Sequence, residues 1–149
     1  GWSVEGGEPM AVERTLGIIK PDAVARGVTG RILAQIEASG LQLEALRLVQ
    51  LSAGQASGFY AVHRHRPFFA SVVAFMSSGP CVLMVLKGEG AIERYRTLMG
   101  ATDPKQAATN TLRALHGSDV EKNAVHGSDG AATAAQEFEF FRAALGRWI

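Results

Sequence analysis

Cysteine is nearly absent from this chain, with Cys81 as the single occurrence among 149 residues. An intramolecular disulfide is therefore excluded, and a reducing compartment is the simpler assumption. An excess of charge of one sign is also missing, because 15 basic residues stand against 14 acidic ones and leave a formal net charge of +1. This balance gives no electrostatic reason for general binding to nucleic acid or to a membrane. Any preference for polyanions must come from Lys and Arg side chains that converge locally.

Long apolar runs are missing too. No stretch approaches the roughly 18 consecutive apolar residues that a membrane-spanning helix needs, and no secretory signal opens the sequence. We therefore expect a cytoplasmic protein without a membrane partner. Residues 1–9 contain Gly and Glu without periodicity and are interpreted as a tag remnant or a disordered arm. Residues 10–149 fit one domain with a single core.

Hydrophobic periodicity predicts four strands, several helices and one long loop. Strands are expected at residues 15–19, 41–48, 81–86 and near 125, and helices at residues 28–39, 52–60, 67–76, 91–99 and 131–145. The alternation of the second strand shifts phase at Leu46, which a bulge or a sheet covered on both faces would explain. Residues 101–123 show no sustained period and are expected to form an ordered loop with one helical turn. Four strands with helices on one face are typical of an α+β sandwich of the ferredoxin-like kind, with an antiparallel sheet.

The most informative segment is Asn123-Ala-Val-His-Gly-Ser-Asp129. It places His126 directly after an apolar pair and before Gly127, which would remove steric cover from the imidazole. A free imidazole has a pKa of about 6.5, so much of it is neutral and nucleophilic near pH 7. Such a histidine at a strand end could attack phosphorus and hold a phosphoryl group. The sequence contains neither of the two common glycine-rich phosphate loops, so a nucleotide site would have to be built from side chains.

Six segments occur in an order and at a spacing similar to those of the nucleoside diphosphate kinases: Ile18-Ile-Lys-Pro-Asp22, Arg66-Pro-Phe-Phe69, Ser78-Gly-Pro80, Leu98-Met-Gly-Ala-Thr-Asp-Pro104, Thr111-Leu-Arg113 and Asn123-Ala-Val-His-Gly-Ser-Asp129. The chain resembles short bacterial members of this family from about Glu13 to Phe141. The resemblance implies an enzyme that transfers the γ-phosphoryl group of ATP or another nucleoside triphosphate to a nucleoside diphosphate. The route is a ping-pong mechanism through a phosphohistidine, and it would maintain nucleoside triphosphate pools.

By this resemblance His126 is the nucleophile, Glu137 orients its ring through the other nitrogen, and Ser128 assists Glu137. Tyr60 is expected beside the histidine, where its hydroxyl could bond the phosphoryl group. Arginine gives planar paired donors to phosphate oxygens, and lysine gives a compact charge. The side chains that match the family positions for phosphate are Lys20, Arg96, Thr102 and Arg113.

The resemblance also implies that Phe68 stacks on one face of the nucleobase and Val120 covers the other. Asn123 and Lys20 are expected to reach the ribose hydroxyls. An aromatic face contacts any base, so a site without hydrogen-bond readers should tolerate bases broadly. We expect Mg²⁺ to arrive on the nucleotide, bridging phosphate oxygens, because no cluster of carboxylates or histidines suggests a dedicated metal site.

The other three histidines are expected to have no role in the reaction. His63 and His65 stand among arginines and are expected to be exposed, since cationic surroundings disfavour metal binding. His116 opens a second His-Gly-Ser-Asp tetrapeptide, but the residue eleven positions later is Gly127 rather than a glutamate. We interpret His116 as a solvent-facing loop histidine.

Two other classes of function stay open from the sequence. A nucleotide-binding or protein-interaction module could keep this fold without turnover, although no nucleophile, lysine or phosphate-binding arginine is missing. Nucleic-acid binding through arginine-rich patches lacks both net charge and a recognition motif. The resemblance implies a homo-oligomer. Residues 115–119 depart from the family pattern in a loop near its subunit contacts, so tetramer and hexamer both stay open.

Overall fold

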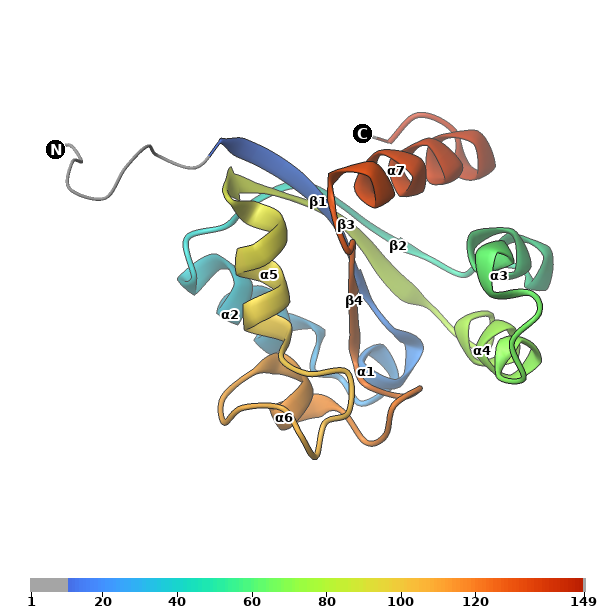
Figure 1. The fold of residues 1–149 in the computed structure, drawn as a ribbon, viewed down its shortest axis with the longest axis horizontal. Coiled ribbons are helices and arrows are strands. Elements are labelled where there is room, and N and C mark those ends of the chain that lie inside the picture. Colours follow the sequence, from blue (N-terminus) through green and yellow to red (C-terminus); the bar gives the residue numbers. More distant parts are fainter. Residues whose placement is uncertain (1–10, 149) are drawn as a thin grey trace, which may run out of the picture.

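The chain folds around one four-stranded sheet (Figure 1). The structure is a computed structural model that describes residues 11–148, so the interpretation of residues 1–9 lies outside the described residues. The helices and strands follow in the order β1 Val12–Ile19, α1 Pro21–Ala25, α2 Thr29–Ala38, β2 Gln42–Val49, α3 Ala53–Phe59, the 3₁₀ helix η1 Ala61–His63, α4 Phe69–Met76, β3 Cys81–Glu89, α5 Ala91–Met99, α6 Leu112–His116, β4 Val125–Gly127 and α7 Ala131–Leu145. Within residues 11–148, every helix is too short or too polar to cross a membrane.

The sheet has the strand order β2-β3-β1-β4, and each neighbouring pair runs antiparallel. This arrangement confirms the predicted antiparallel α+β fold of the ferredoxin-like kind. The register between β2 and β3 shifts between Leu43 and Ala45, so the phase change in the sequence reflects a bulge. Strand β4 lies at one edge and pairs with the end of β1, with Ile18 opposite His126.

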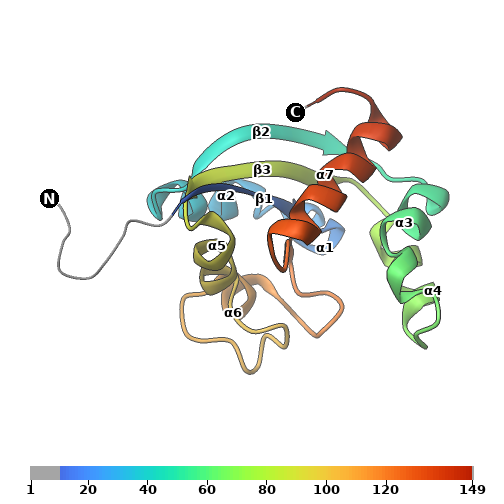
Figure 2. The ribbon, with the colours of Figure 1, turned by 45° about the horizontal axis from the view of Figure 1, so that its top comes forward.

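Helices cover both faces of the sheet, which corrects the expectation of helices on one face. Side chains alternate along a strand, so neighbours in β1 enter different halves of the core. Ile18 belongs to the cluster that contains Phe141 of α7, whereas Ile19 belongs to the cluster that contains Tyr95 of α5. Figures 1 and 2 show α2 and α5 on one side of the sheet and α7 on the other. The sheet therefore divides the single expected core into two.

Local sequence signals account for the short helices that carry the site. Helix α1, which periodicity did not predict, begins with Pro21 at its first position after Lys20 as N-cap. Ser52 caps α3 in a capping box, because its hydroxyl accepts from the Gln55 N–H at 3.0 Å and its own N–H donates to the Gln55 side chain at 2.9 Å. Helix α6 supplies the one helical turn expected within residues 101–123, and the Thr111 side chain caps it.

Candidate active site

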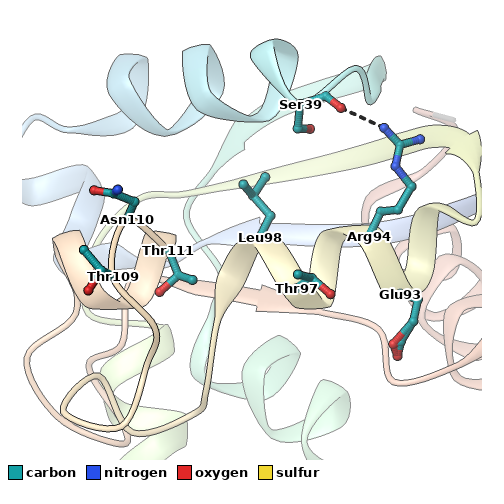
Figure 3. A pocket seen from close by; sticks show the side chains of 8 residues that line it. All are labelled: Ser39, Glu93, Arg94, Thr97, Leu98, Thr109, Asn110 and Thr111. Atoms are coloured by element: carbon teal, nitrogen blue, oxygen red, sulfur yellow. Dashed lines mark hydrogen bonds between the residues drawn. The ribbon is translucent and has the colours of Figure 1, made fainter.

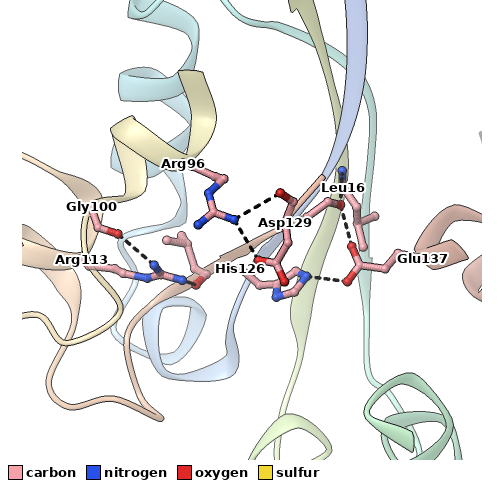
Figure 4. A network of polar contacts seen from close by, with 9 residues as sticks. Leu16, Arg96, Gly100, Arg113, His126, Asp129 and Glu137 are labelled. Carbon is pink, nitrogen blue, oxygen red and sulfur yellow. Dashed lines mark hydrogen bonds and ion pairs between the residues drawn. The ribbon is translucent and has the colours of Figure 1, made fainter. Parts of the chain in front are cut away.

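His126 occupies the middle of the short edge strand β4. Its Nε2 lies 3.0 Å from Glu137 Oε2 of α7, and the other oxygen of Glu137 accepts a 2.6 Å hydrogen bond from the Ser128 hydroxyl. Ser128 is held in turn, because its Oγ accepts the N–H of Leu16 at 3.2 Å (Figure 4). This chain of bonds orients the ring and favours a proton on Nε2. Nδ1 is then unprotonated, and it points away from Glu137.

The imidazole forms part of the wall of a cavity of about 310 Å³. Elements far apart in the sequence meet here, including the end of α5, helix α6, strand β4 and the segment that follows α3. The residues on its walls are Tyr60, His63, Arg96, Met99, Gly100, Ala101, Thr102, Arg113, His126, Gly127 and Asp129. Two arginines beside a histidine nitrogen make this cavity suited to an anion.

A larger hollow of about 510 Å³ lies between α5, the end of α2 and the loop ahead of α6 (Figure 3). Its arginine, Arg94, donates to the carbonyl of Ser39 at 2.7 Å and to that of Glu89 at 3.1 Å. No histidine, cysteine or lysine lines it. The smaller cavity at His126 is therefore the candidate active site.

The two arginines of the cavity come from different helices. Arg113 of α6 donates to the carbonyl of Gly100 at 2.9 Å and to that of Val125 at 3.1 Å. Arg96 of α5 forms a 3.0 Å ion pair with Asp129, whose side chain is 82% exposed. An ion pair this exposed is screened by water and contributes little, so a phosphate group can replace the carboxylate at small cost.

Lys20 does not line the cavity, but Asn123 links it to Thr102 on the cavity wall. Its Nζ donates to Asn123 Oδ1 at 2.7 Å and to the Glu121 carbonyl at 3.3 Å. Burial, together with the charge of Arg113, lowers the pKa of Lys20 to about 8. Asn123 is buried, and its amide donates to the carbonyl of Thr102 at 2.9 Å. The structure thus joins three of the predicted nucleotide-binding residues in one hydrogen-bonded chain.

The two residues predicted to hold the base are both exposed apolar side chains. Phe68 is 45% exposed and Val120 is 61% exposed. The Ser71 hydroxyl donates to Glu121 Oε1 at 3.1 Å, and this bond ties the helix that follows Phe68 to the loop that carries Val120. The ring of Phe68 also lies against that of His63, with 5.7 Å between centroids. Phe68 therefore stands at the mouth of the cavity that contains His126.

Comparisons with known proteins agree with this geometry. The family model for nucleoside diphosphate kinase matches residues 13–144. The chain belongs to the nucleoside diphosphate kinase family. A nucleoside diphosphate kinase from Bordetella petrii is 59% identical over 132 residues, which are 89% of this chain and 94% of that protein. The predicted resemblance and the predicted phosphotransferase class are both confirmed by this membership.

Solved structures of the family share the fold at high similarity. The nucleoside diphosphate kinase of Aquifex aeolicus superposes with a TM-score of 0.86 at 48% identity, covering 88% of this chain and 95% of that one. The enzyme of Halobacterium salinarum, solved in complex with CDP, gives a TM-score of 0.83 at 38% identity and 88% coverage of each chain. The ferredoxin-like arrangement of the sheet is thus common to these family members and this chain.

Two of the histidine interpretations need correction. His63 is half-buried on the wall of the cavity, so the expectation that it is exposed is wrong, whereas His65 is exposed. His116 ends helix α6 and is half-buried, rather than being a solvent-facing loop residue. Burial lowers the pKa of His116, and the charges of Arg26 and Arg31 lower it further. The ring is therefore predominantly neutral at pH 7 and lies beside two cations.

Sequence reasoning missed two polar side chains on the cavity wall, Asp129 and His63. Asp129 closes the tetrapeptide that His126 opens, and its pairing with Arg96 explains where it points. His63 follows Tyr60 by three residues, which is one turn of the 3₁₀ helix η1, so the two side chains project from the same side. That spacing was the available signal for His63.

The structure gives a different reason for Gly127 than access to the imidazole. A Cβ built on Gly127 would lie 2.7 Å from the ring of Tyr95 and 2.6 Å from Met99 Cε. Tyr95 is fully buried beneath β4. Glycine is therefore needed because helix α5 packs directly against the strand that carries the histidine.

Proposed function

We propose that this chain transfers the γ-phosphoryl group of a nucleoside triphosphate to a nucleoside diphosphate through a phosphohistidine at His126. This activity would maintain nucleoside triphosphate pools. The observation that carries the proposal is the 3.0 Å contact between His126 Nε2 and Glu137, on the wall of a cavity that also holds Arg96 and Arg113. A nucleophile needs a free lone pair and a fixed direction of attack, and this contact supports both.

In the first half-reaction, Nδ1 of His126 attacks the γ-phosphorus in line with the bond to the β-phosphate oxygen. The N–P bond forms as the P–O bond breaks, and the nucleoside diphosphate leaves with the electron pair of that bond. The proton on Nε2 stays in its hydrogen bond, so the carboxylate of Glu137 balances the positive charge that the ring gains. Ser128 keeps that carboxylate in place. In the second half-reaction, an oxygen of another nucleoside diphosphate attacks the same phosphorus and the imidazole leaves.

The charge of the phosphate chain is balanced from several directions. Arg96 and Arg113 offer planar donors, and Lys20 offers a compact charge. We assign the hydroxyls of Thr102 and Tyr60 to phosphate oxygens, because both side chains line the cavity. Burial raises the pKa of Tyr60, so its hydroxyl keeps its proton and acts as a donor at neutral pH.

The base and ribose are assigned to the mouth of the cavity. Phe68 and Val120 would cover the two faces of the base, and Asn123 with Lys20 would bond the ribose. Stacking does not depend on the hydrogen-bonding edge of a base, which supports broad tolerance. The related structure with bound CDP is in keeping with a site that accepts a pyrimidine nucleotide.

Magnesium fits this site as an ion that the nucleotide carries. Residues 11–148 contain no group of three or more His, Cys, Asp or Glu side chains that could hold a metal ion. An Mg²⁺ ion prefers phosphate oxygens and water, and bound to the nucleotide it would neutralise part of the phosphate charge. The arginines and the lysine supply the remainder from the protein.

We also propose that the chain forms a homo-oligomer. Leu46 and Leu48 on the edge strand β2 are 51% and 64% exposed, and they share a hollow with Leu33 and Val24. An open strand edge beside exposed leucines is a surface that a second copy would cover. Light scattering should give the mass of a tetramer or a hexamer, and Leu48→Glu should reduce it. A wild-type protein that stays monomeric at micromolar concentration would contradict the proposal.

The cytoplasmic location expected from the sequence stays a prediction.

The phosphohistidine is tested by incubating the protein with γ-labelled ATP and Mg²⁺ and then adding GDP. We expect an acid-labile phosphoprotein that passes its label to GTP. His126→Ala should abolish labelling, and His116→Ala is the matched control because it changes the histidine of an identical tetrapeptide. Labelling that persists in His126→Ala and disappears in His116→Ala would overturn the assignment. Label that never passes to GDP would favour a phospho-carrier or regulatory role.

A further inference from the structure

The backbone is strained two residues before the nucleophile. Ala124 has a φ of 75°, and Asn110 is the other non-glycine residue with positive φ in the described part of the chain. The N–H of Val125 donates to the carbonyl of Asn123 at 2.9 Å. A bond from residue i+2 to residue i, around a central φ near +75°, is the rare and strained form of the γ-turn. Such strain persists only where the surroundings enforce it, and it gathers at functional sites.

The segment at the start of α1 holds Ala124 from both sides. The N–H of Lys20 donates to the Ala124 carbonyl at 2.8 Å, and the N–H of Ala124 donates to Asp22 Oδ2 at 3.1 Å. The side chain of Asp22 is only 9% exposed, so water competes weakly for this bond. Hydrogen bonds to a carboxylate are among the stronger ones in proteins. Strand β4 adds little restraint of its own, because it is three residues long.

The remaining contacts of Asp22 do not account for its buried carboxylate. Its Oδ1 is buried without a hydrogen-bond partner, and Arg26 lies 3.7 Å from Oδ2 with a side chain that is 44% exposed. An ion pair with so exposed a partner contributes little. Asp22 also does not line the active-site cavity. The bond to Ala124 is therefore the one hydrogen bond of this carboxylate within the described residues, and its charge also raises the pKa of nearby Lys20.

We infer that Asp22 is a positioning residue for phosphoryl transfer, whose buried carboxylate holds the strained turn at Ala124 and thereby sets His126 and Asn123 relative to Lys20. The inference rests on the proposed function of His126. The turn is the chain segment between the residue assigned to the ribose and the nucleophile, so its conformation fixes the distance between them. Asp22 acts through the backbone, without touching the nucleotide.

The test is a series of variants at Asp22, with kcat and KM for ATP and GDP measured on the folded full chain. Asp22→Ala should lower kcat by roughly 10²-fold, the loss typical of a misplaced reacting group. Asp22→Asn keeps an acceptor and should lose less, because a neutral amide accepts a weaker bond than a carboxylate. Glu37→Ala is the control, since it removes an exposed carboxylate of helix α2 that does not line the cavity, and its kcat should stay within about twofold.

A second substitution separates positioning from a general role in folding. Glycine adopts positive φ without a steric penalty, so Ala124→Gly added to Asp22→Ala should recover most of the lost kcat. A double variant as slow as Asp22→Ala, or an Asp22→Ala protein with wild-type kcat, would overturn the inference. Where Asp22→Ala does not fold, Asp22→Asn decides. In the Asp22→Asn protein, the Ala124 amide hydrogen should exchange faster with solvent and kcat should fall. If neither the exchange rate nor kcat changes, the inference is overturned.

The two proposals fail in different ways. If the wild-type protein is never phosphorylated, the proposed function is wrong and the series has no kcat to compare. If the wild type turns over and all Asp22 variants match it, the proposed function stands and the positioning role of Asp22 is wrong.

Discussion

Replacing Glu137 by glutamine should slow phosphoryl transfer strongly while leaving the fold intact. The carboxylate accepts two bonds, from His126 Nε2 at 3.0 Å and from the Ser128 hydroxyl at 2.6 Å. A glutamine offers one acceptor oxygen, so one of the two contacts is lost. If its NH₂ group faces the ring, the imidazole proton must move to Nδ1, the atom that attacks. A hydrogen bond to a charged group contributes about 1.5–3 kcal/mol, which corresponds to a decrease of about 10- to 150-fold in kcat/KM.

The assay is a rapid-quench measurement of phosphohistidine formation from γ-labelled ATP in a single turnover. Glu139→Gln is the matched control. It lies on the same helix, its side chain is 72% exposed, and it pairs only with Arg142, so its rate should stay within about twofold of wild type. A Glu137→Gln protein as fast as wild type would refute the idea that this carboxylate sets the tautomer. An equal loss in both variants would instead implicate helix α7 as a whole.

Three further results are expected. Raising the pH through about 8 should lower kcat/KM, because burial lowers the pKa of Lys20 to about 8 and the ammonium is lost above that value; a flat profile up to about pH 10 would contradict this. Gly127→Ala should lower the free energy of unfolding by about 1–3 kcal/mol in urea titrations, since its Cβ would lie 2.6 Å from a methionine methyl, whereas Gly30→Ala, with no atom within 4 Å, should not. Phe68→Ala should raise KM for ATP, GTP and CTP alike, by the roughly 1–3 kcal/mol of one stacking contact, and a loss confined to one base would refute stacking.

Apolar pattern predicted most of the strands and helices, and it also held a signal about the faces of the sheet that the expectation of helices on one face did not use. The run from Cys81 to Leu86 is apolar throughout, which is typical of a strand buried on both faces. Helix α1 escaped prediction for a different reason. Five residues are too few to show a period of 3.6, and Pro21 reads as the end of the preceding strand as easily as the first residue of a helix.

Residues of the candidate site that belong to sequence motifs could be predicted. Contacts that depend on tertiary packing could not. The family resemblance pointed to Glu137, eleven residues after His126, and the structure places the two side chains in contact. The bond from Ala124 to Asp22 joins residues 102 positions apart, and it exists only because α1 packs against the entry to β4. No local pattern contains such a contact. The place of His63 on the cavity wall raises the same difficulty, since it depends on how the segment between α3 and α4 packs against the rest of the chain.

The two copies of His-Gly-Ser-Asp show how far surroundings outweigh identity of sequence. In residues 126–129, the side chains reach outward to other elements: the serine hydroxyl bonds Glu137 of α7, and the aspartate pairs with Arg96 of α5. In residues 116–119 the Ser118 hydroxyl accepts from Arg26 at 3.2 Å, whereas the aspartate bonds within its own loop. The Asp119 carboxylate accepts the N–H groups of Glu121 and Lys122 at 2.9 and 2.7 Å, which closes a tight turn.

The turn closed by Asp119 has its own consequence for the site. It presents the carbonyl of Val120 to the Asn123 amide at 3.2 Å, and the carbonyl of Glu121 to Lys20 at 3.3 Å. The second tetrapeptide is therefore built into the support of the nucleotide residues, although its histidine lies away from the cavity. Asp119→Ala should release this turn and raise KM with little change in the rate of phosphorylation at saturating ATP. A drop in that rate with KM unchanged would mean that the turn acts on the nucleophile rather than on binding.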